Sequence, residues 1–232
     1  METSANILIL SSAPHSGSNS QALARTFEEG CKNIPGISTT FLSVASLNLP
    51  PFSVDAYSTP LPESAQKLQK LFLENHAVVI ASPIWNFSIP SSLKNMIDWM
   101  GTFALDTALR SQGQLENKPF YLIYTGGAPK VVWEAVLQIT TMHVSEAIRY
   151  FGGVIIGKYF EGGCTLGKGK FGLVVDKRPE SLAKVRSLGK HFSEIAKTFA
   201  TSGELPLYER YTSGFMTKVT LFGSKMLMKL KK

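Results

Sequence analysis

Three scarcities narrow what this 232-residue chain can be. Only two cysteines are present, Cys31 and Cys164, and neither lies in a CxxC motif. This excludes a disulfide framework and a thiolate metal cluster. No apolar run reaches the roughly 18 to 20 residues that cross a bilayer, and no basic stretch precedes the short apolar segment near the N-terminus. We therefore expect the protein to be cytoplasmic.

The chain is also poor in charge, with 18% charged and 44% hydrophobic residues and a mean hydropathy of +0.06. Intrinsic disorder requires low hydrophobicity and high charge, so this balance excludes it. Domains of about 150 residues are common, and the length therefore accommodates one large domain or a domain with an appendage.

Acidic residues are the scarcer charged type, because 17 Asp and Glu stand against 24 Lys and Arg for a formal net charge of +7. Residues 201–232 hold six Lys and Arg against two Glu, which is +4 of that total. The rest of the chain is nearly balanced, so the basic pI does not indicate nucleic-acid binding. We expect a main domain over residues 1–205 and a basic amphipathic extension over residues 206–232.

Within residues 213–232, apolar side chains alternate with lysines. A basic amphipathic segment of this kind binds an anionic membrane surface, which would suit a lipid quinone. Alternatively, the segment packs on the body of the protein or on a second subunit, with its lysines reaching water. The sequence leaves both alternatives open.

Short apolar or β-branched runs predict five strands, at residues 6–10, 39–44, 76–81, 119–125 and 154–160. Helical spacing begins at Gln21 and recurs over residues 63–74, 91–100, 131–151 and 179–199. This alternation is typical of a doubly wound α/β fold, a five-stranded parallel sheet with helices on both faces. Ligands bind such sheets beyond the carboxyl ends of the strands, which selects the loops after strands one, three and four.

The first of these loops, residues 11–20, places hydroxyls, an amide and an imidazole directly before a helix. A helix N-terminus offers unpaired N–H groups and a partial positive charge, so it holds a phosphate without arginine. Ser12, Ser18, Asn19 and Ser20 add donors, and His15 adds a donor or a partial charge. The alternative is a capped turn that binds nothing, since Ser and Asn are favoured at any helix start.

The loop after the third strand, residues 82–90, holds two aromatic residues between prolines. Prolines restrict the backbone, so Trp85 and Phe87 are held ready for a flat apolar ligand and Asn86 for its heteroatoms. The alternative is a rigid loop whose aromatic rings fill the core. After the fourth strand, Gly126 and Gly127 let the main chain approach a ligand closely, although paired glycines are also common in turns.

Two further patterns carry no site. Residues 167–172 match GxGxxG, but the strand-like residues 173–175 follow where the dinucleotide fingerprint needs a helix, so we expect a loop or hairpin. The four histidines are too scattered to predict metal ligation, and no side chain is predicted to be a catalytic reagent.

Residues 83–98, PIWNFSIPSSLKNMID, give the loops a shared interpretation. They are similar to the P-x-Y-N-x-x-x-P-x-x-L-K-N-x-x-D signature of the flavodoxin-like FMN oxidoreductases, which include NAD(P)H-dependent FMN reductases, quinone reductases and azoreductases. The resemblance covers roughly residues 5–200 in the order of its elements. Trp85 stands where Tyr is usual, and His15 lies in a loop where many relatives carry Arg.

The resemblance implies a flavodoxin-like fold, bound FMN, and NADPH or NADH as reductant. It implies that Lys94, Asn95 and Asp98 fix the loop and helix. It implies that the first loop holds the FMN phosphate through Ser12, His15, Ser18, Asn19 and Ser20. It implies that the isoalloxazine ring is lined by Pro83, Ile84, Trp85, Asn86 and Phe87. The pyrimidine edge of that ring would then contact Thr125, Gly126 and Gly127.

If FMN binds, the flavin supplies the hydride chemistry and the protein supplies orientation and electrostatics. We expect a ping-pong oxidoreductase that passes hydride from NAD(P)H through FMN to a quinone, azo compound, nitroaromatic or flavin. N–H groups around Gly126 and Gly127 would stabilise negative charge on the reduced ring. The resemblance also implies a homodimer. The alternatives are a flavodoxin-type electron carrier and a flavin-binding regulatory module.

Overall fold

The computed structural model describes residues 4–15, 17–166 and 172–206. Their strands form one parallel sheet in the order β2-β1-β3-β4-β5, which confirms the predicted flavodoxin-like fold. The order reverses between β1 and β3, and this is the switch point at which such sheets bind ligands. The strands are β1 (Ala5–Ser11), β2 (Ile37–Ser43), β3 (Ala77–Pro83), β4 (Pro119–Thr125) and β5 (Val154–Glu161).

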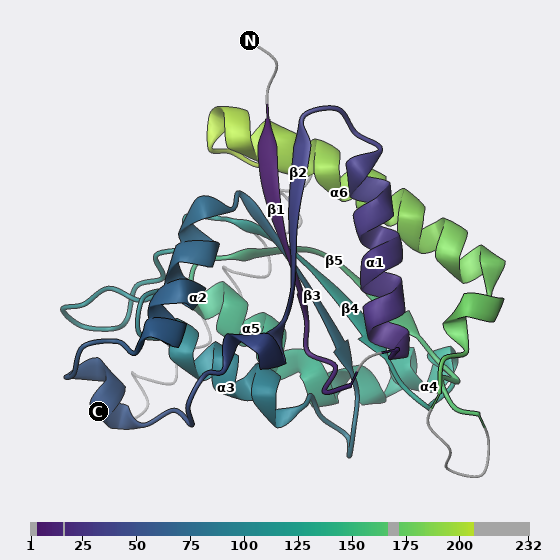
Figure 1. The fold of residues 1–232 in the computed structure, drawn as a ribbon, viewed down its shortest axis with the longest axis horizontal. Helices are drawn as coiled ribbons and strands as arrows, with labels where there is room; N and C mark the ends of the chain where they lie inside the picture. Colours follow the sequence, from purple (N-terminus) through teal and green to yellow (C-terminus); the bar gives the residue numbers. More distant parts are fainter. Residues whose placement is uncertain (1–3, 16, 167–171, 207–232) are drawn as a thin grey trace.

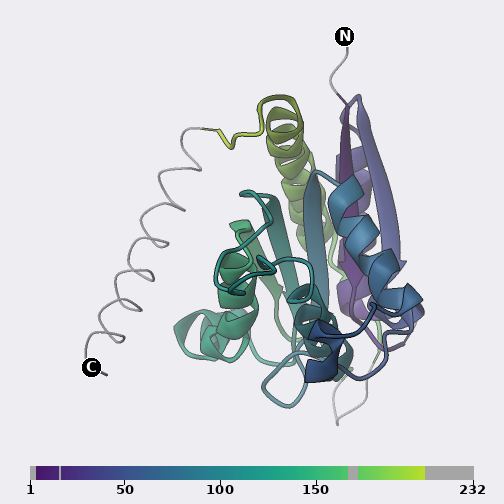
Figure 2. The same ribbon diagram turned by 90° about the vertical axis from the view of Figure 1, so that its left-hand side faces the viewer.

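The described part of the chain also contains six α-helices and four short 3-10 helices. The α-helices are α1 (Asn19–Lys32), α2 (Glu63–Glu74), α3 (Ser91–Met100), α4 (Lys130–Ala135), α5 (Met142–Tyr150) and α6 (Pro179–Ser202). The 3-10 helices are η1 (Val44–Leu47), η2 (Val54–Tyr57), η3 (Leu137–Thr141) and η4 (Val175–Lys177). Figure 1 shows α1 and α6 on one face of the sheet and α2 and α3 on the other. Figure 2 shows β2 and the α5 region at opposite sides of the molecule.

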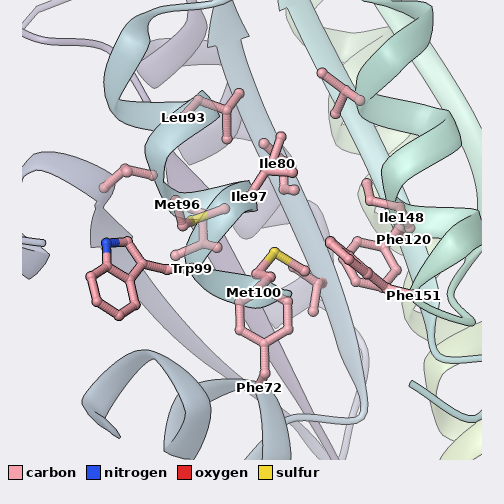
Figure 3. Packing of buried hydrophobic residues seen from close by; sticks show 14 of the residues in the cluster. Phe72, Ile80, Leu93, Met96, Ile97, Trp99, Met100, Phe120, Ile148 and Phe151 are labelled. Carbon is pink, nitrogen blue, oxygen red and sulfur yellow. The ribbon is translucent and has the colours of Figure 1, made fainter. Parts of the chain in front are cut away.

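Side chains alternate between the two faces of each strand, so the sheet is covered by two separate cores. Leu8 and Ile80 lie in the core beneath α2, α3 and α5, whereas Ile7 and Val79 lie in the core beneath α1 and α6. Figure 3 shows residues from α2, α3, β3, β4 and α5 meeting in the first core. Burial on both faces explains the near-continuous apolar runs in the sequence.

Helices α1 and α6 cross so closely that glycine is required on both. A Cβ atom on Gly30 would lie 2.1 Å from the Arg186 carbonyl oxygen. A Cβ atom on Gly189 would lie 2.2 Å from the Phe27 carbonyl oxygen. Backbone cannot yield as a side-chain end can, so these two glycines set the distance between the helices.

Two local predictions were wrong. Residues 131–151 form α4, η3 and α5 rather than one helix, with Val136 at φ −136°, ψ −49° between them. The segment is rich in β-branched residues, which lose side-chain freedom in a helix and weaken it. Residues 173–175 are not a strand, because η4 begins at Val175.

Two segments singled out in the sequence fall largely outside the described residues. The GxGxxG match lies outside the described residues except for Gly172, and so does nearly all of the basic extension, residues 207–232. Within the described ranges, no helix is both long and apolar enough to cross a membrane. No group of three His, Cys, Asp or Glu side chains in those ranges is arranged to hold a metal ion.

Candidate functional site

The loops after β1, β3 and β4 meet at one edge of the sheet and enclose two adjoining hollows, which we call the inner and outer pockets. The inner pocket measures about 70 Å³ and the outer about 260 Å³. They share Ile84, Gly126 and Gly127, and together they fall in the range of roughly 300 to 1000 Å³ that small-molecule sites occupy. The inner pocket is lined by His15, Ser18, Asn19, Pro83, Ile84, Trp85, Thr125, Gly126, Gly127, Cys164, Thr165 and Gly172.

The remaining lining of the outer pocket comes from the hairpin after β3 and from the α4–η3 segment. Of the thirteen residues proposed from the sequence, only Ser12 and Ser20 line neither pocket, because both are buried beneath the first loop. Besides the three shared residues, the outer pocket is lined by Asn86, Phe87, Ala128, Trp133, Leu137, Thr140 and Phe160.

Ser18 forms the N-cap of α1, and its hydroxyl accepts from the Gln21 N–H at 3.1 Å. The Ser20 hydroxyl lies 3.3 Å from the Ser18 hydroxyl. The N–H groups of Asn19 and Ser20 donate to no acceptor within the part of the chain that the structure describes. The loop is therefore a capped turn, as the simpler interpretation predicted, but it still leaves free donors at a helix N-terminus.

The Asn19 side chain does not point free into the pocket. Its Nδ2 donates to the Gly172 carbonyl at 2.9 Å, and its Oδ1 accepts from the N–H groups of Val174 and Val175 at 2.8 and 3.1 Å. Asn19 thus ties the start of α1 to the segment before η4. Only its backbone N–H remains for a ligand.

His15 lines the inner pocket with its ring stacked against that of Trp85. The ring centroids are 6.0 Å apart and the planes differ by 11°. The sequence suggested a phosphate donor at this position, whereas the ring here joins the first loop to the loop after β3. The pair covers one side of the inner pocket.

A two-residue hairpin follows β3. Trp85 and Ser88 exchange backbone hydrogen bonds of 2.8 and 2.9 Å, and the two residues between them, Asn86 and Phe87, have φ of +48° and +60°. Two positive φ values define a type I′ turn, which favours Asn and Gly. The turn sends Trp85 to the inner pocket and Phe87 to the outer one, with Phe87 73% exposed. The alternative that these rings fill the core is therefore wrong.

The loop after β4 is paired with the chain that leaves β5. Gly126 donates its N–H to the Glu161 carbonyl at 3.1 Å and accepts from the Cys164 N–H at 2.9 Å. Among the described residues, the Gly127 N–H has no acceptor, so it rather than the Gly126 N–H is available to a ligand. A Cβ on Gly126 would lie 3.2 Å from the Phe160 ring, and a Cβ on Gly127 would lie 3.1 Å from the Thr165 methyl carbon.

A fourth wall, Cys164 and Thr165 after β5, was not predicted from the sequence. The rule that selected the other loops would have found it, because the carboxyl end of β5 lies at the same sheet edge. Burial raises the pKa of the Cys164 thiol to about 11. The thiol is therefore neutral at physiological pH and is not a ready nucleophile.

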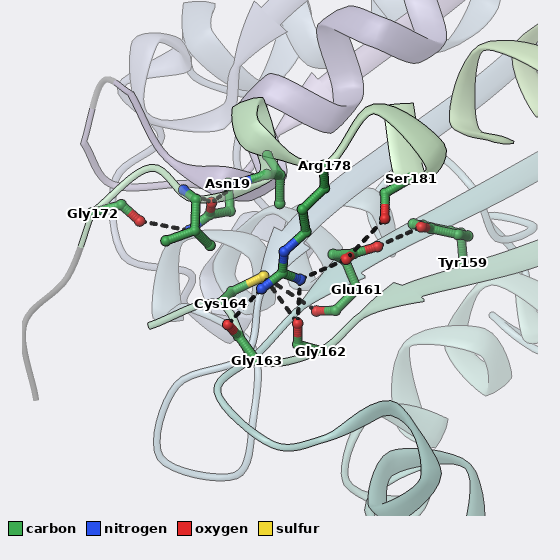
Figure 4. Close-up of polar contacts among 11 residues, drawn as sticks. Asn19, Tyr159, Glu161, Gly162, Gly163, Cys164, Gly172, Arg178 and Ser181 are labelled. Atoms are coloured by element: carbon green, nitrogen blue, oxygen red, sulfur yellow. Dashed lines mark hydrogen bonds and ion pairs between the residues drawn. The ribbon is translucent and has the colours of Figure 1, made fainter. Parts of the chain in front are cut away.

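Arg178, directly before α6, braces this wall (Figure 4). Its guanidinium donates to the Glu161 carboxylate at 2.6 Å and to the carbonyls of Gly162 and Gly163 at 2.7 and 2.8 Å. The Glu161 carboxylate, which is its main partner, raises the pKa of Arg178 further. We call Arg178 and its three acceptors the arginine brace. Because residues 161–164 pair with the Gly126 loop, the brace also positions that loop.

The polar residues of α3 act at some distance from the pockets. The Asn95 Oδ1 accepts from the Phe52 N–H at 2.8 Å, and its Nδ2 donates to the Pro50 carbonyl at 2.9 Å. Lys94 and Asp98 form an ion pair of 2.5 Å at the surface. Asn95 therefore fixes the proline-rich connector before η2 to α3.

Comparisons with known proteins agree with this geometry. The model of the family described as NADPH-dependent FMN reductase matches residues 5–160. An NADPH:quinone oxidoreductase of Arabidopsis thaliana is 28% identical over 96 residues, which are 41% of this chain and 44% of that protein. This chain thus spans less than half of the Arabidopsis protein.

Two further relatives are similar over more of their length. FMN-dependent NADH:quinone oxidoreductase 1 of Bradyrhizobium diazoefficiens is 26% identical over 171 residues, which are 64% of this chain and 82% of that protein. The solved NAD(P)H:quinone oxidoreductase of Methanothermobacter marburgensis superposes with a TM-score of 0.63 at 19% identity, covering 82% of this chain and 96% of that one. At that identity, the superposition shows the shared fold.

Proposed function

This chain belongs to the NADPH-dependent FMN reductase family, an oxidoreductase family, and we propose that it holds FMN at the two joined pockets and passes electrons from NAD(P)H to a small acceptor. The observation that carries the proposal is the convergence of four strand-end segments on two joined pockets. A flavin needs a polar cradle for its phosphate and a close backbone approach for its ring. The site offers both.

The residues of the first loop fit a phosphate. The Ser12 hydroxyl is buried and has no hydrogen-bond partner among the described residues, and an unpaired buried hydroxyl costs roughly 1 to 3 kcal/mol. The free N–H groups of Asn19 and Ser20 lie at the N-terminus of a 14-residue helix. Phosphate oxygens at the start of α1 would supply the acceptors that these two N–H groups lack, directly above the unpaired Ser12 hydroxyl.

The loop after β4 and the segment after β5 fit the edge of a flat ring. A Cβ on Gly126 would crowd the Phe160 ring, and a Cβ on Gly127 would crowd the Thr165 methyl group. The Gly127 N–H is free within the described residues and is aimed by a loop that the arginine brace holds. A fixed N–H of this kind stabilises negative charge on a bound group without reorganisation.

Bound FMN supplies the hydride chemistry. The protein contributes an outer pocket walled by Phe87 on one side and by the stacked rings of Trp133 and Phe160 on the other. This pocket accommodates one flat substrate at a time, so nicotinamide and acceptor bind in turn. We therefore propose ping-pong turnover with quinones, azo compounds, nitroaromatics or free flavin as acceptors.

Beside the outer pocket, the α4–η3 segment exposes an apolar strip formed by Val131, Val136 and Ile139. Exposed apolar groups gathered at a pocket mouth mark an interaction surface. We propose that a second copy of the chain covers the strip and forms a homodimer. Sedimentation of a Val136→Glu, Ile139→Glu variant tests this: a monomer is expected, and an unchanged dimer would refute the proposed surface.

For the basic extension, residues 206–232, two proposals stand: a peripheral membrane contact, or packing on the body of the protein or on a second subunit. We also propose that the protein is cytoplasmic. Flotation with anionic liposomes separates the two proposals for the extension. Equal flotation of the full chain and of a chain ending at Thr212 would eliminate the membrane contact.

The experiment that tests the function is a visible absorption spectrum of the purified protein, followed by anaerobic NADPH or NADH. We expect FMN absorbance that either nicotinamide bleaches with uptake of two electrons, and parallel lines in steady-state kinetics. A one-electron endpoint would favour the flavodoxin-type carrier. A protein that stays colourless after incubation with FMN would favour a module without redox function.

A further inference from the structure

A third cavity, which we call the lysine pocket, lies on the other side of the Trp133–Phe160 stack from the outer pocket. It measures about 190 Å³ and is enclosed between the edge strand β5 and the α4–η3 segment. The two rings are 4.5 Å apart and nearly parallel, and they line both cavities. The lysine pocket is therefore separated from the proposed acceptor site by a single aromatic wall.

The Tyr124 hydroxyl is a buried donor in the lining of this pocket. Tyr124 is 1% exposed, and its hydroxyl has no hydrogen-bond partner in the described part of the chain. The nearby Thr141 hydroxyl donates to the Gln138 carbonyl at 3.3 Å. A buried phenol without a partner is costly, so a ligand that accepts its proton would be favoured in this pocket.

Two lysines line the same pocket. Lys158 on β5 has no acidic group within 4 Å in the described residues, and Lys130 reaches Glu134 only at 3.7 Å, with both side chains largely exposed. Burial lowers the pKa of Lys158, and the nearby positive charge of Arg149 lowers it further. Glu146, whose negative charge acts on Lys158, is already paired with Arg149 at 2.5 Å.

The lining also holds the Glu134 carboxylate, which pairs with Lys130, so the positive charge left over in the pocket is that of Lys158. Water would satisfy the tyrosine hydroxyl but would leave the charge of Lys158 without a partner. An anion with several acceptor oxygens satisfies both groups, because hydrogen bonds between charged partners are roughly twice as strong as neutral ones. The volume is below the roughly 300 Å³ at which sites for whole organic ligands begin.

We propose that the lysine pocket binds a phosphate-type oxyanion through the Tyr124 hydroxyl and the ammonium groups of Lys130 and Lys158. Two sources of this chemistry exist. One is free inorganic phosphate. The other is the 2′-phosphate of NADPH, whose nicotinamide would occupy the outer pocket across the aromatic wall; this second source rests on the proposed function.

Calorimetric titration of the full-length, FMN-saturated protein with inorganic phosphate tests the site, since FMN occupies the first loop. Three variants are compared with the wild type. Lys158→Met removes the charge and keeps the stem, and Tyr124→Phe removes only the hydroxyl. Lys190→Met, on the exposed side of α6, makes the same charge change on the other face of the sheet.

We expect Lys158→Met to weaken phosphate binding by about tenfold or more, the effect of losing one charged hydrogen bond. Lys190→Met should leave the binding unchanged. Tyr124→Phe should weaken binding and raise the melting temperature in phosphate-free buffer by about 2 to 4 °C, because it removes an unpaired buried hydroxyl. Absence of phosphate binding by the wild type, or equal affinity of the wild type and Lys158→Met, overturns the proposal.

Two nucleotide fragments then identify the source. Tighter binding of 2′,5′-ADP than of 5′-ADP, lost in Lys158→Met, indicates the 2′-phosphate of NADPH. Equal binding of the two fragments, with phosphate still bound through Lys158, indicates free phosphate. If the protein binds no FMN, the proposed function fails, yet the phosphate titration of wild type against Lys158→Met still decides the lysine pocket.

Discussion

The exposed Phe87 is the site residue whose replacement separates function from folding most cleanly. Its backbone has φ of +60°, a region that L-residues enter at a cost of roughly 1 to 2 kcal/mol. The side chain is 73% exposed and lies in the wall of the outer pocket. We therefore consider Phe87→Gly, which relieves the backbone and removes the ring.

Three contributions to the free energy of unfolding nearly cancel. Relief of the positive φ stabilises by roughly 1 to 2 kcal/mol, and the flexibility of glycine in the unfolded chain costs about 0.5 to 1 kcal/mol. Full burial of a Phe side chain contributes about 1.5 to 3 kcal/mol, so the buried quarter here contributes about 0.5 kcal/mol. We expect the free energy of unfolding to change by less than about 1 kcal/mol, which limits the shift in melting temperature to about 2 to 4 °C.

Activity should fall although stability does not. An aromatic contact adds about 0.5 to 1.5 kcal/mol beyond burial, so kcat/KM for a quinone should drop by roughly 2- to 12-fold. Thermal melting and steady-state kinetics measure the two effects, with Phe87→Tyr, which keeps the ring, as the control. A loss of more than about 2 kcal/mol in stability, or an unchanged kcat/KM, would refute this reasoning about the hairpin.

Other residues give further predictions. Gly189→Ala should lower the free energy of unfolding by about 1 to 3 kcal/mol in chemical denaturation, because its Cβ would contact the Phe27 carbonyl. Helix propensity alone predicts a gain in stability. A stabilised variant would therefore contradict the close crossing of α1 and α6. Arg178→Ala should weaken FMN binding by about tenfold, measured by flavin fluorescence. The control variant Arg186→Ala, which changes a surface arginine, should leave FMN binding unchanged. Equal effects of the two variants would argue against the arginine brace. Burial raises the pKa of Cys31 from 9.0 to about 11, so the native state retains a proton that the unfolded chain releases, and stability should fall as pH rises from 9 to 11. Cys31→Ala should reduce that fall by about 2 to 3 kcal/mol in denaturation at each pH, and an identical pH profile would exclude the thiol as its cause.

The sheet was predictable because its strands are marked by short stretches of neighbouring residues in the sequence. Each strand is buried on both faces, so residues such as Leu8 and Val79 form apolar runs that are visible without any contact information. The break at Val136 was not predicted, because apolar spacing continues through it while the backbone does not. Periodicity records which face is buried and says little about where a helix of β-branched residues ends.

The candidate site was predictable to the level of its loops. The strand-end rule identified the segments that hold His15, Trp85 and Gly127, and the structure brings them to one pocket. The role of the Asn19 side chain was not predictable, because its partners lie more than 150 residues away in sequence. Long-range hydrogen bonds of this kind leave no local pattern.

The arginine brace has a consequence for how much of the chain is needed to build the site. The family match ends at residue 160, one position before Glu161 and well before Arg178. A transplant of residues 5–160 into another scaffold would carry three of the loops but not the guanidinium that anchors the fourth. The smallest portable unit of this candidate site therefore extends to Arg178, the residue before α6.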